Sequence, residues 1–295
     1  MSLQLKSFLK RKASINCRGQ LIDLSQPKVM GIVNITPDSF FSGSRFKGDA
    51  ALLSRVETIL NEGGEMVDMG AYSTRPGAAY VSAEEEISRL MPALAAIRKS
   101  FPGVIISVDT FRSELARKVV CEGEADIIND ISGGDMDEAM FDTVAELKVP
   151  YVLMHIQGTP QTMQAAPSYK DVVADVSFSL SQKVDRLREK GVNDIIIDPG
   201  FGFGKTLEHN YKLLNQLEEL NLFQLPILVG LSRKSMIYKL LNTSAEQALN
   251  GTSILNAMAL NKGASILRVH DVKEAIECVK LVEKLKESET QTFVL

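Results

Sequence analysis

Eight short apolar runs, each followed by a segment with helical periodicity, constrain the fold of this chain more than any other feature of its sequence. The runs are rich in β-branched residues, as buried parallel strands are, and cover residues 29–34, 66–70, 104–110, 127–130, 151–155, 195–198, 227–234 and 266–271. Eight βα units in a chain of 295 residues match the count and size of a (β/α)8 TIM barrel. A doubly wound open sheet is the alternative, although such a sheet usually needs fewer strands.

No linker or low-complexity stretch interrupts this alternation, so we predict a single TIM-barrel domain over residues 1–295. Within it, residues 1–27 are expected to form an N-terminal extension and a short β-hairpin. Apolar stretches flank Arg18 and Gly19 in residues 15–23, which predicts the hairpin and a role as a plug for the bottom of the barrel. Helices are expected at 49–62, 136–148 and 272–286, and Ser82 is expected to cap another helix with the help of Glu85.

Polar side chains lie at the end of nearly every predicted strand. They are Asn34, Asp68, Asp109, Asn129, His155, Asp198, Lys234, Arg268 and His270. Because the carboxyl ends of all strands in a barrel meet at one mouth, we expect these side chains to form one site. After Asp198 the chain breaks into a glycine-rich loop, whose backbone can approach a ligand closely.

The strand-end residues divide into two chemical groups. Asp109, Asn129, Asp198 and Lys234 supply the acceptors and donors that suit a flat heterocycle. A second, cationic or neutral group suits phosphate oxygens and contains Asn34, Arg75, Arg268 and His270. Together they indicate a substrate with a heterocyclic head and an anionic leaving group.

Several other polar residues have equally good structural explanations. Asp68 precedes a glycine and is expected to hold its own turn about as readily as a ligand. His155 fits a wall residue or a contact, His209 fits a solvated surface residue or a helix cap, and Lys205 fits an exposed flank of the glycine loop. The loop lacks the spacing of a dinucleotide fingerprint or a Walker motif, and the sequence has no zinc-binding pattern.

Net charge, cysteine content and hydropathy argue against nucleic-acid-binding, disulfide-bonded and membrane proteins. The 33 basic and 37 acidic side chains leave a formal net charge of −4, so no nucleic-acid partner is expected. Cys17, Cys121 and Cys278 are far apart and odd in number, which argues against a disulfide framework and favours the cytoplasm. No apolar segment long enough for a signal peptide or membrane span follows the basic N-terminus, so no membrane association is expected.

In order along the chain, the motifs resemble the dihydropteroate synthase (pterin-binding) family, the target of sulfonamides, from Val29 to the last helix. The matching motifs are GIVNITPDSF (31–40), STRPGA (73–78), SVDT (107–110), INDISG (128–133), DPGFGFGK (198–205), GLSRKS (230–235) and RVHD (268–271). The resemblance implies a transferase of folate biosynthesis that condenses 6-hydroxymethyl-7,8-dihydropterin pyrophosphate with 4-aminobenzoate, using Mg²⁺. It also implies a homodimer formed through helices late in the chain.

By the same resemblance, each part of the substrates has its own residues. The pterin is expected to contact Asp109, Asn129, Met154, Asp198, Gly230, Lys234 and Arg268, and the pyrophosphate Asn34, Arg75, Arg268 and His270. The 4-aminobenzoate pocket is expected to contain Phe40, Thr74, Pro76, Phe203 and Ser235. Asn34 is expected to meet the metal, and the catalytic residues are expected to be Asp109, Lys234, Arg268 and His270.

One stretch departs from the family pattern. A second glycine and a glutamate usually follow the first glycine after the second strand, whereas here Gly70 is followed by Ala71 and Tyr72. Two alternatives to the synthase remain open. A methyltetrahydrofolate:corrinoid methyltransferase would account for Asp109, Asn129 and Asp198 but not for the phosphate-binding group, and a catalytically silent pterin-binding paralogue is the other.

Overall fold

Eight parallel strands form a barrel in the computed structural model, which describes residues 14–35, 45–72 and 81–290. The strands are β3 (Lys28–Asn34), β4 (Met66–Gly70), β5 (Ile105–Asp109), β6 (Ile127–Asp130), β7 (Tyr151–Met154), β8 (Ile195–Asp198), β9 (Leu228–Val229) and β10 (Ile266–Val269). They pair in the order β8-β7-β6-β5-β4-β3-β10-β9, and a parallel bridge between Ile197 and Ile227 joins the two ends. The predicted TIM barrel is confirmed.

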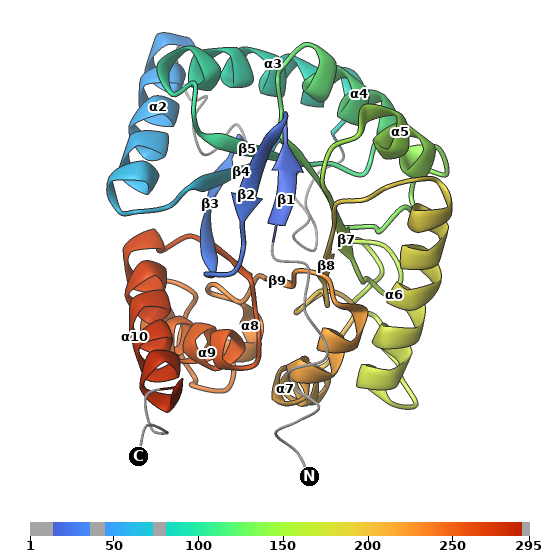
Figure 1. The fold of residues 1–295 in the computed structure, drawn as a ribbon, viewed down its shortest axis with the longest axis vertical. Helices are drawn as coiled ribbons and strands as arrows, with labels where there is room; N and C mark the ends of the chain where they lie inside the picture. The colour runs from blue at the N-terminus through green and yellow to red at the C-terminus, as the bar shows by residue number, and fades with distance from the viewer. Residues whose placement is uncertain (1–13, 36–44, 73–80, 291–295) are drawn as a thin grey trace.

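Helices between the strands form the outer ring of the barrel (Figure 1). They are α2 (Arg45–Asn61), α3 (Ala83–Ser100), α4 (Ser113–Cys121), α5 (Met140–Leu147), α6 (Val172–Glu189), α7 (Leu207–Asn215), the 3-10 helix η2 (Leu217–Phe223), α8 (Ser235–Tyr238), α9 (Leu249–Asn261) and α10 (Val272–Thr290). Ser82 caps α3 as predicted, accepting from the backbone N–H of Glu85, whereas the Glu85 side chain pairs with Arg89.

Several element boundaries differ from the predictions. Helix α2 begins at Arg45 and helix α5 at Met140, so the first starts earlier and the second later than periodicity indicated. Strand β9 contains only Leu228 and Val229, because Gly230 begins a loop that leads to Lys234 at the N-cap of α8. The predicted strand over 227–234 was therefore too long, since its apolar run continues into a buried loop.

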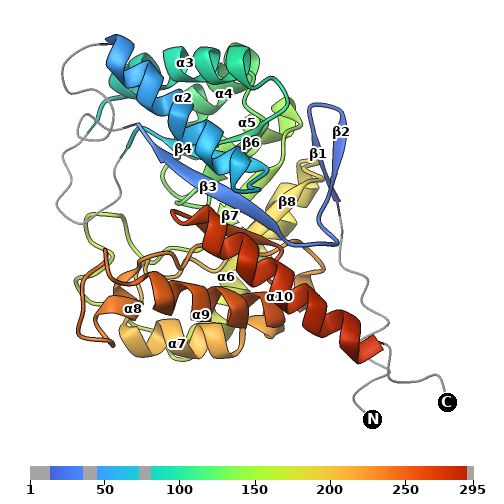
Figure 2. The ribbon, with the colours of Figure 1, turned by 90° about the vertical axis from the view of Figure 1, so that its left-hand side faces the viewer.

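The N-terminal hairpin consists of β1 (Ser14–Cys17) and β2 (Gln20–Asp23) and closes one end of the barrel. Arg18 and Gly19 both have positive φ, at 50° and 86°, as a tight hairpin turn requires. Figure 2 shows the hairpin beyond the start of β3. Its apolar residues pack against one inward-facing residue of each barrel strand: Met30, Met66, Ile105, Ile127, Val152, Ile196, Leu228 and Ile266. The predicted plug is confirmed.

Alternation along the strands decides where the site lies. In β4, Val67 and Met69 face the helices within the main core, whereas Met66 packs inside with the hairpin. Successive side chains of a strand point to opposite faces, so Asp68 also points inward, one layer above Met66. In other strands the position two residues after the apolar inward residue is also polar, at Ser107, Asn129, Asp198 and Arg268. The barrel is therefore apolar at its hairpin end and polar at the opposite mouth.

Gly31 provides a test of this packing, because it faces helix α2. A Cβ atom at position 31 would lie 2.6 Å from Cδ1 and 2.7 Å from Cγ1 of Ile59. Gly31→Ala should therefore lower the free energy of unfolding by about 1–3 kcal/mol, measured by urea denaturation. Gly103→Ala is the matched control, since nothing lies within 4 Å of a Cβ there. An equally small effect at both positions would contradict the packing, and Ile59→Val should restore part of the loss.

Candidate active site

A buried network around Asp68 forms the centre of the barrel mouth. Asp68 is fully buried, and its Oδ2 accepts from Nε of Arg268 at 2.6 Å and from the side-chain amide of Asn129 at 3.2 Å. The Ser107 hydroxyl donates to Oδ1 of Asp68 at 2.5 Å. Nη2 of Arg268 also reaches Oδ2 of Asp109 at 3.3 Å. Four strands thus contribute to one cluster, and the expectation that Asp68 holds its own glycine turn was wrong.

The charged groups of this cluster shift one another's pKa values. Burial and the neighbouring charge of Asp68 raise the pKa of Asp109 to about 7, against the opposing effect of Arg268. Burial works to lower the pKa of Arg268, but Asp68 and Asp109 outweigh it and raise that pKa above its usual range. Arg268 is therefore a permanent cation, whereas Asp109 titrates near neutral pH.

Asp198 and Lys234 form the second charged group at the mouth. Burial raises the pKa of Asp198, while Lys234, the N–H of Gly200, Lys205 and Arg268 oppose this change. Burial lowers the pKa of Lys234 to about 8, with Asp198 opposing and Arg268 adding to the decrease. The ammonium of Lys234 donates to the carbonyl of Phe201 and lies 4.8 Å from the centre of the Phe203 ring.

These contacts bring the predicted pterin residues to one place. Asp109 pairs with Asn129 in the sheet register, and Nη2 of Arg268 bridges Asp68 and Asp109. A Cβ on Gly230 would lie 3.7 Å from Nζ of Lys234, so this glycine lies beside that ammonium. Met154 is buried at the end of β7 in an apolar cluster.

The glycine loop after Asp198 is held by its own backbone and by side chains from its neighbours. Gly200, Gly202 and Gly204 have φ values of 70°, 81° and 62°, a region that side-chain-bearing residues rarely adopt. Oδ1 of Asp198 accepts from the N–H of Gly200 at 2.7 Å. Lys205 is 3% exposed, so the expectation of an exposed flank was wrong. Its ammonium lies beneath the loop.

The predicted phosphate-binding residues are only partly within the described chain. Asn34 ends β3, Arg268 lies in β10, and His270 follows β10, with its N–H donating to Oγ of Ser232 at 3.1 Å. Burial and the charge of Arg268 lower the pKa of His270 to about 4, so its imidazole is neutral at pH 7. Arg75 lies outside the described residues.

Of the residues predicted to form the 4-aminobenzoate pocket, again only some lie within the described chain. Phe203 packs with Tyr72 against the apolar cluster that contains Met154 and Phe111, and Ser235 is the first residue of α8. Phe40, Thr74 and Pro76 lie outside the described residues. Tyr72 stacks edge-on against Phe111 at 5.2 Å and accepts from Nε2 of Gln161 at 3.0 Å. The phenol that departs from the family pattern therefore ties the β4 loop to the segment after β7.

Arg233 is a residue of the mouth that sequence reasoning missed. Its guanidinium donates to both carboxylate oxygens of Asp271, at 2.9 and 2.7 Å, and to the carbonyls of Ala245 and Glu246. The pair links the loop after β9 to the loop after β10. Its position between Ser232 and Lys234, within a motif already singled out, was the available signal.

The two remaining histidines have structural partners. Nδ1 of His155 lies 3.0 Å from Nζ of Lys205, and burial together with the Lys205 charge lowers the pKa of His155 well below its usual range. His155 is therefore a neutral wall residue. Nδ1 of His209 accepts from the N–H of Thr206 at 3.3 Å in a capping box at the start of α7, which confirms its prediction as a cap.

The donors present fit a magnesium ion held mainly by a substrate. No group of three or more His, Cys, Asp or Glu side chains in the described residues is placed to hold a metal ion. Mg²⁺ often uses one or two protein oxygens together with substrate phosphates and water. The side-chain amide of Asn34, half-buried at the end of β3, offers one such oxygen.

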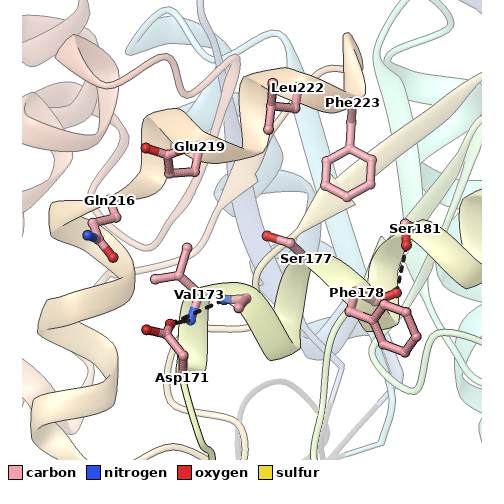
Figure 3. Close-up of a pocket in the computed structure, with 10 residues that line it drawn as sticks. Asp171, Val173, Ser177, Phe178, Ser181, Gln216, Glu219, Leu222 and Phe223 are labelled. Atoms are coloured by element: carbon pink, nitrogen blue, oxygen red, sulfur yellow. Dashed lines mark hydrogen bonds between the residues drawn. The ribbon is translucent and has the colours of Figure 1, made fainter.

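Two surface hollows lie away from the strand ends. One, of about 570 Å³, lies between α6 and η2 and includes Phe178, Leu222 and Phe223 (Figure 3). The other, of about 420 Å³, lies among α7, α8 and α9 and includes Leu240, Ile254 and Met258. Neither is lined by any of the strand-end residues.

Within the described part of the chain, every helix is too short or too polar to cross a membrane.

Comparisons with known proteins agree with this geometry. The sequence matches the family of pterin binding enzymes over residues 30–270. It is 45% identical over 268 residues to dihydropteroate synthase of Escherichia coli (strain K12), covering 90% of this chain and 94% of that protein. It is 43% identical over 263 residues to dihydropteroate synthase of Haemophilus influenzae, covering 88% and 94%.

Solved structures that resemble this chain are also dihydropteroate synthases. Dihydropteroate synthase of Yersinia pestis in complex with a sulfonamide drug superposes with a TM-score of 0.86 at 39% identity, covering 93% of this chain and 99% of that one. The Xanthomonas albilineans enzyme with 4-aminobenzoic acid also has a TM-score of 0.86, at 36% identity, covering 93% and 98%. The chain belongs to the pterin binding enzymes and, within them, to the dihydropteroate synthases.

Proposed function

We propose that this chain joins 6-hydroxymethyl-7,8-dihydropterin pyrophosphate to 4-aminobenzoate, giving 7,8-dihydropteroate and pyrophosphate, with Mg²⁺ as cofactor. The observation that carries the proposal is the cluster of Asp68, Asp109 and Arg268, which sets carboxylate and guanidinium charges side by side at the barrel mouth. A reaction that separates a cationic carbon from an anionic leaving group needs both signs of charge. The related Xanthomonas albilineans structure contains 4-aminobenzoic acid.

In the proposed reaction, the C–O bond between the pterin methylene and the pyrophosphate breaks first. Pyrophosphate leaves with the electron pair, and the methylene carries positive charge that Asp109 stabilises. The amine of 4-aminobenzoate then donates its lone pair to form the C–N bond and loses a proton to solvent. This arylamine is already neutral at pH 7, so the step requires no dedicated general base.

Each group at the mouth has a role that follows from its chemistry. Asp198 and Asn129 would read the ring N–H and amino groups of the pterin, and Lys234 would donate to its acceptors. Arg268 would stack on the pterin and, with His270 and Asn34, hold the pyrophosphate. Mg²⁺, held by Asn34 and the pyrophosphate, would supply positive charge that neutralises the leaving group.

The decisive experiment measures pyrophosphate release from the dihydropterin substrate by purified, folded protein. Release should require both 4-aminobenzoate and Mg²⁺, and chromatography should identify dihydropteroate as the other product. Release without incorporation of 4-aminobenzoate would indicate hydrolysis alone. No turnover by folded protein would support the silent pterin-binding paralogue, and methyl transfer to a corrinoid would support the methyltransferase alternative.

Replacing Asp109 tests its part in the mechanism. Asp109→Asn keeps the size of the side chain but removes the charge that faces the methylene, so kcat should fall by about 100-fold or more. Asp142→Asn is the matched control, because Asp142 forms an exposed ion pair with Lys190 on the outer ring. Near-normal kcat in Asp109→Asn would exclude Asp109 from the chemical step.

The pKa values of the mouth predict a bell-shaped pH profile of kcat/KM. Asp109 has a raised pKa of about 7, so it is protonated below that pH and ionised above it. Lys234 has a lowered pKa of about 8, so it loses its proton above that pH. Activity should therefore fall below about pH 7 and again above about pH 8, measured in the free-enzyme parameter kcat/KM. An acid limb at about pH 4, the ordinary range of a carboxyl group, would contradict this assignment.

We also propose a homodimer through α9 and α10, which lie side by side (Figure 2). Ile254 and Met258 on α9 are 48% and 51% exposed, and Leu281 and Leu285 on α10 are 68% and 67% exposed. A cluster of large exposed apolar side chains on adjacent helices is typical of a protein–protein interface.

A cytoplasmic location also remains our proposal, supported by the three free cysteines.

The dimer is tested by sedimentation equilibrium. The unchanged protein should sediment as a dimer, and Met258→Glu combined with Leu281→Glu should shift it to the monomer. Leu222→Glu is the control, because Leu222 is 71% exposed on η2, outside the proposed interface. A monomeric unchanged protein would contradict the proposal.

A further inference from the structure

Lys205 lies beneath the glycine loop of residues 199–204, with four polar atoms around its ammonium. Nζ lies 2.9 Å from the carbonyl oxygen of Gly200, 3.0 Å from that of Phe203, 3.0 Å from Nδ1 of His155 and 3.4 Å from the carbonyl oxygen of His155. An ammonium group has three protons, and these acceptors surround it without access to bulk water. This site in the loop is therefore built for a cation.

The loop lies directly on the segment that follows β7. A Cβ on Gly200 would lie 1.9 Å from the carbonyl oxygen of His155, and a Cβ on Gly204 would lie 2.5 Å from that of Gln157. Both contacts are to backbone atoms, so neither neighbour can move away cheaply. The glycines permit this close approach, and the hydrogen bonds of Lys205 hold the two segments together.

Lys205 and Lys234 bind different carbonyls of the same loop. Lys234 donates to the carbonyl of Phe201, whereas Lys205 donates to those of Gly200 and Phe203. Between them, the carbonyl of Gly202 accepts from Nε2 of Gln164 at 2.7 Å. The conformation of the loop, and with it the direction of the Phe203 ring, therefore depends on both ammonium groups.

The same loop connects Lys205 to Asp198. Asp198 accepts from the N–H of Gly200, the residue whose carbonyl Lys205 binds. The positively charged groups that act on Asp198 are Lys234, Lys205 and Arg268, all of which oppose the effect of burial on its pKa, and the carboxylate of Asp109 also interacts with it. Lys205 in turn faces Asp198 and Lys234, together with the neutral ring of His155.

We propose that Lys205 is a positioning residue for the pterin site, which orients the loop bearing Phe203 and the Lys234 anchor and keeps Asp198 ionised through its charge. This role rests on the proposed synthase reaction but adds a residue that does not touch either substrate. Burial lowers the pKa of Lys205 to about 7, so its ammonium is charged on the acid side of that value, where Asp198 would otherwise take up a proton. The pterin site thus depends on the Lys205 ammonium, whose own pKa responds to burial and to the charges of Asp198 and Lys234.

The test compares Lys205→Met and Lys205→Gln, which both remove the charge, while only Gln keeps a hydrogen-bond donor. In both, kcat/KM for the dihydropterin pyrophosphate should fall by about 10- to 100-fold, because a small displacement of binding groups has effects of this size. The acid limb of kcat/KM, which Asp109 sets in the unchanged protein, should become steeper and move to higher pH, because Asp198 loses a nearby positive charge and its raised pKa adds a second protonation. Lys212→Met is the matched control, since Lys212 lies on the neighbouring helix α7 and its substitution removes an exposed ion pair with Asp171, the N-cap of α6.

A purely structural lysine would lower the thermal midpoint without moving the acid limb, and that result would overturn the proposal. Normal kcat/KM in either Lys205 variant would also overturn it, provided that the unchanged protein is active. An inactive unchanged protein would instead reject the proposed function. If neither variant folds, NMR of ¹³C-labelled lysine in the unchanged protein replaces them. The titration midpoint of the Lys205 Cε signal should move when the dihydropterin pyrophosphate binds, and an unmoved midpoint would reject the coupling.

Discussion

The ion pair between Asp68 and Arg268 is the interaction on which the arrangement of the barrel mouth depends. Strand alternation places Asp68 inside the barrel with no exposed surface, where an unpaired carboxylate would be strongly unfavourable. Arg268 supplies the opposite charge from β10, and Asn129 and Ser107 supply hydrogen bonds from β6 and β5. Satisfying one buried charge therefore fixes side chains from four strands and orients Arg268 toward Asp109.

Opposite charges at this mouth only partly compensate for burial, which opposes the ionisation of Asp109, Asp198 and Lys234. Asp109 titrates near pH 7 and Lys234 near pH 8, since burial outweighs the attraction of Arg268 for Asp109 and of Asp198 for Lys234. Groups with such pKa values respond readily when a charged substrate arrives. Arg268, between two carboxylates, is the exception and stays cationic.

Much of this architecture could be predicted from the sequence, because apolar alternation and strand-end polarity are local patterns. The barrel, the hairpin plug and the grouping of Asp109, Asn129 and Asp198 follow from them. The burial of Lys205 could not be predicted, since it depends on carbonyls of a loop whose shape comes from contact with the segment after β7. The ion pair of Asp68 with Arg268 escaped prediction because strand-end polarity places both side chains at the mouth but does not say which of the side chains there pair.

The short β9 gives the barrel a seam. Two residues and one bridge to Ile197 provide few backbone hydrogen bonds between β8 and β9 compared with the longer ladders elsewhere. The bond from Lys234 to the carbonyl of Phe201 spans this seam at the mouth, joining the loops that follow the two strands. Lys234, which we propose to bind the pterin, thus also joins the two sides of this seam, so ligand contact and the local rigidity of the barrel wall are linked.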